Sequence, residues 1–288
     1  MSEDLPCAAC SWTRKRRESC RYPSHIKLFY ECSDRGVWAI GSNLVIKEMG
    51  CSPENPEARH TRFLQEHTSI PVQEILDEWT EEGRYFLVTK RVPGITLKEA
   101  WPAMSESEKE SIAKQTVEYL SQLRKIRSSC VESVGGGPVY SAWLFRGDDG
   151  VPHGPFSSSS QIWDEMAKAL SHVPENMRRL LQQRIPVAEP YTFTHADLSM
   201  GNIIVNNGKV TGIIDWEISG FFPVWWEFAA ANIYHDEDDY NWKIMLLQGM
   251  EDHTGALEFW LDFRSLSNYP DLDDRGKRLV GDSTSGTK

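Results

Sequence analysis

Three side chains that together could support phosphoryl transfer lie close to one another in the second half of the sequence: Asp197, Asn202 and Asp215. The side-chain oxygens of Asn202 and Asp215 are suitable ligands for Mg²⁺, and the Asp197 carboxylate could act as a base that orients an attacking hydroxyl group. Phosphoryl transfer needs this combination, because the metal neutralises the charge of a triphosphate while the base positions the acceptor. The sequence therefore predicts a Mg²⁺ site at Asn202 and Asp215, beside a catalytic base at Asp197.

A β-hairpin is predicted between the two metal ligands. Ile203-Ile204-Val205 is a β-branched run, Asn206-Asn207-Gly208 is typical of a tight turn, and residues 210–214 form the returning strand. Because the two strands of a hairpin are adjacent, we expect Asn202 and Asp215 to lie side by side at one edge. An isolated H-x-D in a loop is usually structural, but here the base, the Asn and the strand-end Asp occur in order around one hairpin, which favours a site.

The sequence H-x-D-x-x-x-x-N that begins at His195, together with the Asp215 segment Ile-Asp-Trp-Glu, resembles the catalytic loop and metal-binding aspartate of the kinase-like fold. It is more similar to the aminoglycoside phosphotransferase family than to protein kinases, which would have Arg at position 196 and Phe-Gly after Asp215. The resemblance covers residues 26–265. It implies an α+β, two-lobe protein-kinase-like fold, with a small antiparallel β-rich N-lobe and a larger, mainly helical C-lobe. It also implies ATP as the phosphoryl donor and a catalytic segment that includes Asp197 and His195, with His195 bridging the loop to the core.

In the predicted N-lobe, three short β-prone segments precede the first helix, at residues 26–30, 36–40 and 43–48. Alternation along the third segment places Val45 and Lys47 on one face of the sheet. The resemblance implies that Lys47 contacts the phosphates of the nucleotide and pairs with a glutamate of the helix. Without the downstream motif, a lysine at the edge of a strand would simply be a solubilising residue.

A helix is predicted from Pro56-Glu57 to His67, since proline is favoured in the first turn of a helix. Glu57 is the expected partner of Lys47. Glu54 and Glu66 are alternatives.

The segments after this helix predict further strands and the connection between the lobes. Thr68-Ser69-Ile70-Pro71-Val72 is expected to start a strand and resembles the fungal-type subset of the family, and residues 85–89 are typical of a buried strand. Lys90 and Val92 lie in the segment that leads out of this buried strand. The resemblance implies that this segment is the hinge between the lobes and that its backbone binds the edge of the adenine.

One departure from the kinase pattern concerns the loop that would cover the phosphates. Asp34-Arg35-Gly36-Val37 contains one glycine and no G-x-G, whereas protein kinases carry a Gly-rich loop at this place. The phosphotransferase family tolerates this difference. The role of the loop in binding phosphates stays open.

Helical periodicity predominates after Thr96. Ser105-x-x-Glu108 is typical of a capping box, and the apolar stripe that continues to Ile126 indicates a core-facing helix. Residues 128–160 are rich in Gly, Ser and Pro and predict a long loop that shapes one wall of the substrate site. Further helices are predicted at residues 161–170, 176–184, 242–250 and 255–264.

Three groups of residues after Asp215 bear on the predicted site. The family that the chain resembles often has an Asp shortly before an Ala here, which braces the catalytic loop, and Glu227 stands nearest to its place. Trp225 and Trp226 are expected in the core, with substrate stacking as the alternative. The acidic run at residues 235–239 is expected to be solvated, but it would attract a cationic substrate if it borders the cleft.

Composition excludes several classes of protein. A net charge of −11 argues against a general nucleic-acid binder, and no apolar run is long enough to span a membrane. The N-terminus lacks the pattern of a signal peptide, so we expect a cytoplasmic protein. Six cysteines in 288 residues do not form a disulfide scaffold, and Cys7-x-x-Cys10 with Cys20 is half of a zinc site at best.

The predicted domain organisation has four parts. Residues 1–24 are expected to form a flexible arm, and its basic run is interpreted as a solvated face or, alternatively, a nuclear signal. Residues 25–92 are expected to form the nucleotide-binding N-lobe and residues 93–270 the C-lobe. Residues 271–288 are expected to form a disordered tail.

The predicted reaction moves the γ-phosphoryl group of ATP to a hydroxyl group of a small molecule, with a cationic acceptor as one option. A catalytically silent binding module on the same fold is the main alternative. A protein kinase is less favoured, since no A-P-E segment follows Asp215. The acceptor, the oligomeric state and the choice between ATP and GTP stay open.

Overall fold

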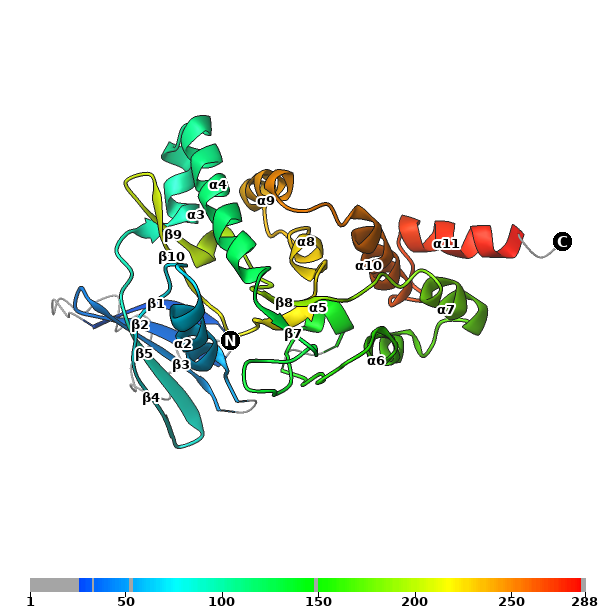
Figure 1. Ribbon diagram of the computed structural model, residues 1–288, viewed down its shortest axis with the longest axis horizontal. Coiled ribbons are helices and arrows are strands. Elements are labelled where there is room, and N and C mark those ends of the chain that lie inside the picture. Colours follow the sequence, from blue (N-terminus) through cyan, green and yellow to red (C-terminus); the bar gives the residue numbers. More distant parts are fainter. Residues whose placement is uncertain (1–25, 33, 52–53, 148–149, 286–288) are drawn as a thin grey trace, which may run out of the picture.

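The structure is a computed structural model that describes residues 26–32, 34–51, 54–147 and 150–285. The predicted N-terminal arm, with its basic run and the cysteines at positions 7, 10 and 20, lies outside the described residues. Along the longest axis of the molecule, a β-sheet lies at one end and helices lie at the other (Figure 1). The predicted division into a β-rich part followed by a mainly helical part is therefore seen in the structure.

The N-terminal part is an antiparallel sheet of five strands in the order β1-β2-β3-β5-β4. The strands are β1 (Ile26–Cys32), β2 (Arg35–Ile40), β3 (Leu44–Gly50), β4 (Ile75–Glu81) and β5 (Arg84–Lys90). Helix α2 (Glu57–His67) packs on this sheet, because its Ala58 shares a buried cluster with Met49, Tyr85 and Leu87. The predicted strands at residues 26–30, 36–40, 43–48 and 85–89 and the predicted helix are confirmed.

The C-terminal part is mainly helical and contains two small three-stranded sheets, β10-β9-β6 and β11-β8-β7. Its strands are β6 (Ile95–Thr96), β7 (Arg127–Ser128), β8 (Tyr191–Thr194), β9 (Ile203–Asn206), β10 (Lys209–Ile213) and β11 (Gly220–Pro223). Its α-helices are α3 (Leu97–Ala100), α4 (Glu106–Leu123), α5 (Ala142–Phe145), α6 (Ser159–Met166), α7 (Glu175–Gln182), α8 (Trp226–Ala230), α9 (Glu237–Gly249), α10 (Thr254–Leu266) and α11 (Asp274–Ser285). Single-turn 3₁₀ helices lie at η1 (Trp101–Ala103), η2 (Ala167–Leu170) and η3 (Met200–Asn202).

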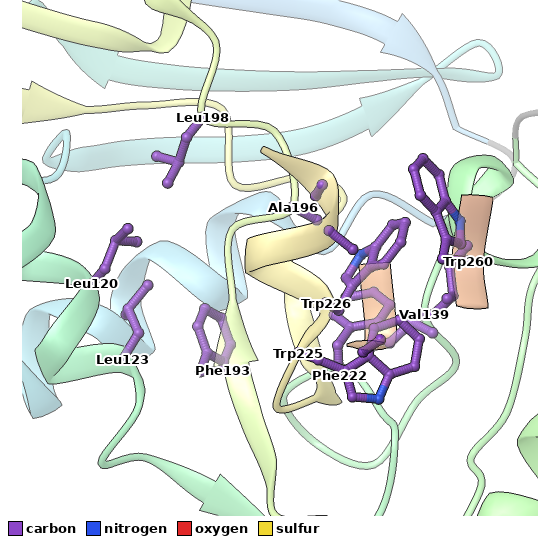
Figure 2. Close-up of a cluster of buried hydrophobic side chains, with 14 of the residues drawn as sticks. Leu120, Leu123, Val139, Phe193, Ala196, Leu198, Phe222, Trp225, Trp226 and Trp260 are labelled. Atoms are coloured by element: carbon purple, nitrogen blue, oxygen red, sulfur yellow. The ribbon is translucent and has the colours of Figure 1, made fainter. Parts of the chain in front are cut away.

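Large aromatic side chains form the centre of the C-terminal part. Figure 2 shows Phe222, Trp225 and Trp226 grouped together with Trp260 beside them, and the rings of Trp226 and Trp260 meet edge-on at 5.5 Å. Trp225 and Trp226 are buried. They are therefore core residues, as expected, and substrate stacking by either ring is excluded. Truncating a buried tryptophan of this kind to alanine costs about 3–5 kcal/mol.

The predicted capping box at the start of α4 is confirmed. The Ser105 hydroxyl accepts a hydrogen bond from the Glu108 backbone N–H, and the Glu108 carboxylate accepts one from the Ser105 backbone N–H. The helix ends at Leu123, slightly before the predicted end. The predicted long loop at residues 128–160 contains the short helix α5 and three isolated β-bridges.

The predicted strand at residues 68–72 is wrong. This segment runs from the end of α2 toward β4 without strand pairing, because its backbone groups bond to other partners. The Ser69 N–H donates to the side chain of Gln122, and the Pro71 carbonyl accepts the N–H of Ile213. The segment therefore ties the sheet to the C-terminal part instead of extending the sheet.

The predicted disordered tail at residues 271–288 is also wrong where the structure describes it, because α11 occupies most of it. Arg275 donates to the buried carboxylate of Asp262 on α10 at 2.6 Å, and the Gly276 N–H donates to Asp273 at 2.7 Å. These contacts anchor a polar segment whose composition alone suggests disorder. In the described part of the chain, no helix combines the length and the apolar character that crossing a bilayer requires.

Candidate active site

A cleft of about 1030 Å³ lies between the N-terminal sheet and the C-terminal part. Among the predicted site residues, those that line it are Lys47, Lys90, Val92, Asp197, Asn202 and Asp215. His195 and Glu57 are buried beside it and do not line it. The structure therefore brings together, around one cavity, groups that are up to 168 positions apart in the sequence.

The β9–β10 hairpin places Asn202 beside the Asp215 segment. Ile203 pairs with Ile213 in the ladder, and the Ile214 N–H donates to the Asn202 carbonyl at 3.0 Å. The Asn202 side-chain NH₂ donates to the backbone carbonyl of Asp197 at 2.9 Å and to its carboxylate at 3.0 Å. Because the NH₂ group is bonded to Asp197, the amide oxygen of Asn202 is the atom left for a metal ion.

His195 joins the catalytic loop to the strand end that carries Asp215. Its Nε2 lies 3.0 Å from the Ile214 carbonyl, and its Nδ1 lies 3.2 Å from the Asp197 N–H. These two contacts require a neutral ring with the proton on Nε2, because Nδ1 must accept. The ring also lies 4.4 Å from that of Trp216. This geometry fits the predicted bridging role rather than proton transfer.

Glu227, at the start of α8, lies beneath the catalytic loop. Its two carboxylate oxygens accept the backbone N–H of His195 at 2.7 Å and that of Ala196 at 3.2 Å. Ala196 has a φ of 70°, a conformation that costs of order 1–3 kcal/mol in a residue with a side chain. The two hydrogen bonds hold this strained turn, which fixes the direction in which Asp197 leaves the loop.

Lys47 lies between two carboxylates. Its Nζ is 2.7 Å and 2.9 Å from the two oxygens of Glu57 and 2.8 Å from Asp215. Burial alone would lower the pKa of Lys47, but the negative charges of Asp215 and Glu57 outweigh it and raise the pKa above its ordinary value. Lys47 is therefore a permanent cation in the cleft. The structure selects Glu57 over Glu54 and Glu66 as its partner.

A glutamine that the sequence analysis did not single out orients Glu57. Gln73 is buried, and its Nε2 donates to the Glu57 carboxylate at 2.8 Å. Burial raises the pKa of Glu57, against the lowering effect of Lys47. Burial would also raise the pKa of Asp215, but the positive charge of Lys47 reverses this and lowers it. The Asp215 carboxylate is therefore ionised and is 35% exposed.

Glu217 is the main acidic residue whose role was not predicted, although it is part of the Ile-Asp-Trp-Glu segment. One oxygen from each of Glu57, Asp215 and Glu217 lies within 4.8 Å of the others. Because Glu57 is buried and does not line the cleft, the groups best placed to hold a metal are Asp215, Glu217 and the amide oxygen of Asn202. Glu217 also forms an ion pair with Arg35, the first residue of β2.

In the hinge segment, the backbone N–H groups of Lys90 and Arg91 already have hydrogen-bond partners. The Lys90 N–H donates to the Glu74 carbonyl at 2.9 Å, and the Arg91 N–H donates to Asn43 at 2.6 Å. Neither N–H is free for a ligand. Among the described residues, the backbone groups of Val92 have no hydrogen-bond partner, so Val92 is the better candidate for binding an adenine edge.

Two glycines allow the hinge to pack closely on the hairpin. A Cβ at Gly212 would lie 2.6 Å from a methyl group of Val92, and one at Gly94 would lie 2.4 Å from the Val205 carbonyl. Gly94 has a φ of +131°, which a residue with a side chain rarely adopts. The hinge therefore lies directly against the β9–β10 hairpin that brings Asn202 and Asp215 together.

The acidic run at residues 235–239 has mainly structural contacts. Asp236 caps α9 and forms an ion pair with Lys98 at 3.0 Å. Asp239 is buried and accepts the Met200 N–H at 3.2 Å. From this run only His235 lines the cleft, so these contacts do not support an acidic wall that attracts a cation.

A sequence model of the family described as the phosphotransferase enzyme family (APH) matches residues 54–260 of this chain. Hygromycin-B 4-O-kinase from Escherichia coli is 24% identical over an alignment of 189 residues, and the match covers 60% of this chain and 51% of that protein. The chain therefore spans about half the length of this curated relative.

Several solved structures have the same fold. The streptomycin–ATP ternary complex of APH(2'')-IIa superposes with a TM-score of 0.57 at 16% identity, over 90% of both chains. A thermostable mutant of APH(4)-Ia in its ternary complex with ADP and hygromycin B gives a TM-score of 0.54 at 15% identity, over 91% of this chain and 94% of that one. At these identities the likeness concerns the fold, and the predicted kinase-like α+β fold is confirmed. The resemblance to a fungal-type subset stays a prediction.

Proposed function

Because this chain belongs to the phosphotransferase enzyme family, we propose that it transfers the γ-phosphoryl group of ATP, with Mg²⁺, to a hydroxyl group of a small molecule. The observation that carries this proposal is the convergence of Lys47, Asp197, Asn202 and Asp215 on one cleft. A cleft of about 1030 Å³ can hold a nucleotide together with a small acceptor.

The residues present fit a metal-bound nucleotide. The carboxylates of Asp215 and Glu217 and the amide oxygen of Asn202 are the hard oxygen ligands that Mg²⁺ prefers. When bound, the metal would neutralise phosphate charge. Lys47 would contribute a second positive charge from the opposite lobe, and the hinge at Val92 would bind the base.

Asp197 would orient the acceptor hydroxyl group and take up its proton. One oxygen of its carboxylate accepts from Asn202 at 3.0 Å. This hydrogen bond and the contact between the Asp197 N–H and His195 fix the carboxylate at the cleft wall. A fixed base next to the metal ligands positions the hydroxyl group for attack, which is the main task of the protein in phosphoryl transfer.

A small acceptor is favoured over a protein acceptor. Between Asp215 and the start of α8 the chain forms only β11, which pairs along its length with β8. This short connection leaves no segment to dock a peptide, as the activation segment of a protein kinase does. The hygromycin-B 4-O-kinase similarity points in the same direction. The acceptor of this chain is proposed only as a hydroxyl-bearing small molecule.

A turnover screen tests the proposal. The parent protein and Asp197→Asn are incubated with ATP, Mg²⁺ and a panel of aminoglycosides, sugars and amino alcohols, and ADP formation is followed. We expect ADP formation that depends on one compound class and is lost in Asp197→Asn. Phosphorylation of added proteins only would favour a protein kinase. ATP binding without turnover on any compound would favour a catalytically silent module.

A further inference from the structure

Arg35, the first residue of β2, brings a positive charge to the end of the cleft that Asp215 and Glu217 line, although this strand start is not a glycine-rich loop. Gly36 does not have a positive φ, and a Cβ at this position would lie 3.1 Å from the Trp38 indole nitrogen. Its missing side chain therefore makes room for Trp38. The neighbouring Arg35 lines the cleft and reaches across to the C-terminal part.

Arg35 is bound through only part of its guanidinium group. Its Nη1 donates to one oxygen of Glu217, and among the described residues this is the hydrogen bond that the structure shows for its side chain. A guanidinium has five N–H donors, and the Arg35 side chain is 47% exposed. Most of its donors therefore remain available to a ligand in the cleft.

Glu217 places this guanidinium next to the metal ligands. A Glu217 oxygen lies within 4.8 Å of the Asp215 carboxylate. The positive charge of Arg35 also interacts favourably with the negative charge of Asp215. A nucleotide whose metal is bound at Asp215 must place its terminal phosphates in the same space. Arginine is well suited to this contact because its planar fork binds phosphate through two parallel hydrogen bonds.

The ion pair between Arg35 and Glu217 does more than stabilise the fold, because it satisfies a largely buried carboxylate. An exposed arginine contributes little when it pairs across a surface, but the Glu217 side chain is only 13% exposed and needs a cation or hydrogen-bond donors. Its second oxygen accepts from Asn55 at 3.2 Å. If Arg35 leaves, a metal ion beside Asp215 can take its place at Glu217.

We propose that Arg35 binds the terminal phosphates of the nucleotide and that Glu217 holds it in position while the cleft is empty. On nucleotide binding, Arg35 exchanges Glu217 for phosphate oxygens. Arg35 thereby replaces the backbone N–H groups that a glycine-rich loop would supply. This inference rests on the proposed ATP-binding function and adds a residue to it.

Calorimetric titration with AMP, ADP and ATP tests the phosphate contact, because AMP lacks the terminal phosphates. Arg35→Ala should weaken ATP and ADP binding about 10- to 100-fold, as expected for loss of charged hydrogen bonds, and leave AMP binding within about 2-fold. Arg35→Lys should bind ATP and ADP with affinities between those of the parent and Arg35→Ala, since lysine keeps the charge and loses the planar fork of hydrogen-bond donors. Arg62→Ala is the matched control, because Arg62 lies in the same lobe, is 48% exposed and pairs with Glu78 away from the cleft. It should bind all three nucleotides like the parent.

A double-mutant cycle tests the exchange. In metal-free titrations, Glu217→Gln should strengthen ATP binding when Arg35 is present and do so much less in the Arg35→Ala background. Thermal melts of the nucleotide-free variants check that each one folds. Equal loss of AMP and ATP affinity in Arg35→Ala, no loss of either, or an equal effect of Glu217→Gln in both backgrounds would overturn the inference. A parent protein that binds no ATP would instead overturn the proposed function.

Discussion

The two walls of the cleft are held in different ways. On the C-terminal side, the catalytic loop is fixed by buried hydrogen bonds from Glu227 and by the contacts of His195 with Ile214 and Asp197. On the N-terminal side, the long cationic side chains of Lys47 and Arg35 reach across the cleft to carboxylates of the C-terminal part. The C-terminal wall is therefore fixed by buried hydrogen bonds to its backbone, whereas the N-terminal wall depends on ion pairs. Of these, the pair of the 47% exposed Arg35 is held less firmly than the contacts of Lys47, which is 15% exposed.

The largest expected effect follows from removing Asp215, the proposed metal ligand at the C-terminal wall. Asp215→Ala should abolish turnover, because it removes the carboxylate that faces the cleft next to Asn202. It also frees Lys47 from one of its two carboxylate partners. The fold should remain cooperative, since the Asp215 side chain is partly exposed. Turnover and thermal unfolding are measured together, and unchanged activity in a cooperatively folded variant would contradict the metal assignment.

The brace beneath the catalytic loop should affect stability and activity together. Glu227→Ala leaves the buried N–H groups of His195 and Ala196 unpaired, at about 1–3 kcal/mol for each group. Because the strained turn at Ala196 then relaxes, kcat should also fall. Glu227→Gln keeps one accepting oxygen and should be intermediate. Denaturant unfolding and kcat of both variants are compared, and a destabilised Glu227→Ala with the kcat of the parent would show that the brace does not position Asp197.

His60 lies where the N-terminal and C-terminal parts meet, and it should make the free energy of unfolding depend on pH. Burial lowers its pKa to about 4 from the ordinary value of 6.5. The neutral ring is required because Nδ1 donates to the Trp216 carbonyl at 2.9 Å while Nε2 accepts the Val134 N–H at 3.4 Å. The unfolded chain therefore takes up the proton first as the pH falls.

Neutral His60 stabilises the fold fully above pH 6.5. This contribution to the free energy of unfolding, on the order of 3 kcal/mol, is lost progressively as the pH falls toward 4. Unfolding free energies at pH 7 and pH 4.5 are compared for the parent and for His60→Gln, which cannot titrate. The variant should lose less stability over this interval. Equal losses in the two proteins would contradict the role of His60.

The smallest effect is expected at Lys90. Its side chain is exposed and pairs with exposed Glu74, and such a pair contributes about 0–1 kcal/mol. If nucleotide recognition at the hinge uses the backbone of Val92, then Lys90→Ala should change ATP affinity by less than about 2-fold, because a backbone contact is indifferent to that side chain. A larger loss, measured by calorimetry, would show that the Lys90 side chain contacts the nucleotide.

What could be predicted from the sequence depends on how far apart the interacting residues lie in the chain, and both walls contain predicted features. The hairpin that brings Asn202 next to Asp215 is encoded locally, by a β-branched run and an Asn-Asn-Gly turn, and the structure forms it as expected. The pair of Lys47 with Glu57 was expected from the family resemblance, with Glu54 and Glu66 as alternatives, and the structure forms it.

The parts that were not predicted depend on contacts between distant segments. Arg35 and Glu217 are 182 positions apart, and neither is unusual in its local sequence. Gln73 lies in an irregular segment where we expected a strand to continue, and its role follows only from burial beside Glu57. Helix α11 is polar, and its order depends on the carboxylate of Asp262 from α10. Local patterns carry no information about such pairings.

The most direct test of the account is to measure ATP affinity and kcat in parallel for Asp197→Asn and Lys47→Ala, with the acceptor found in the turnover screen. Asp197→Asn should lower kcat by about 10²- to 10⁴-fold, the range for loss of a general base, with ATP affinity nearly unchanged. Lys47→Ala should weaken ATP binding and lower turnover together, because it removes a contact present in the ground state and the transition state alike. If Asp197→Asn keeps the full activity of the parent, or if the parent binds ATP and never turns it over, the assignment of this cleft as a phosphotransferase active site is contradicted.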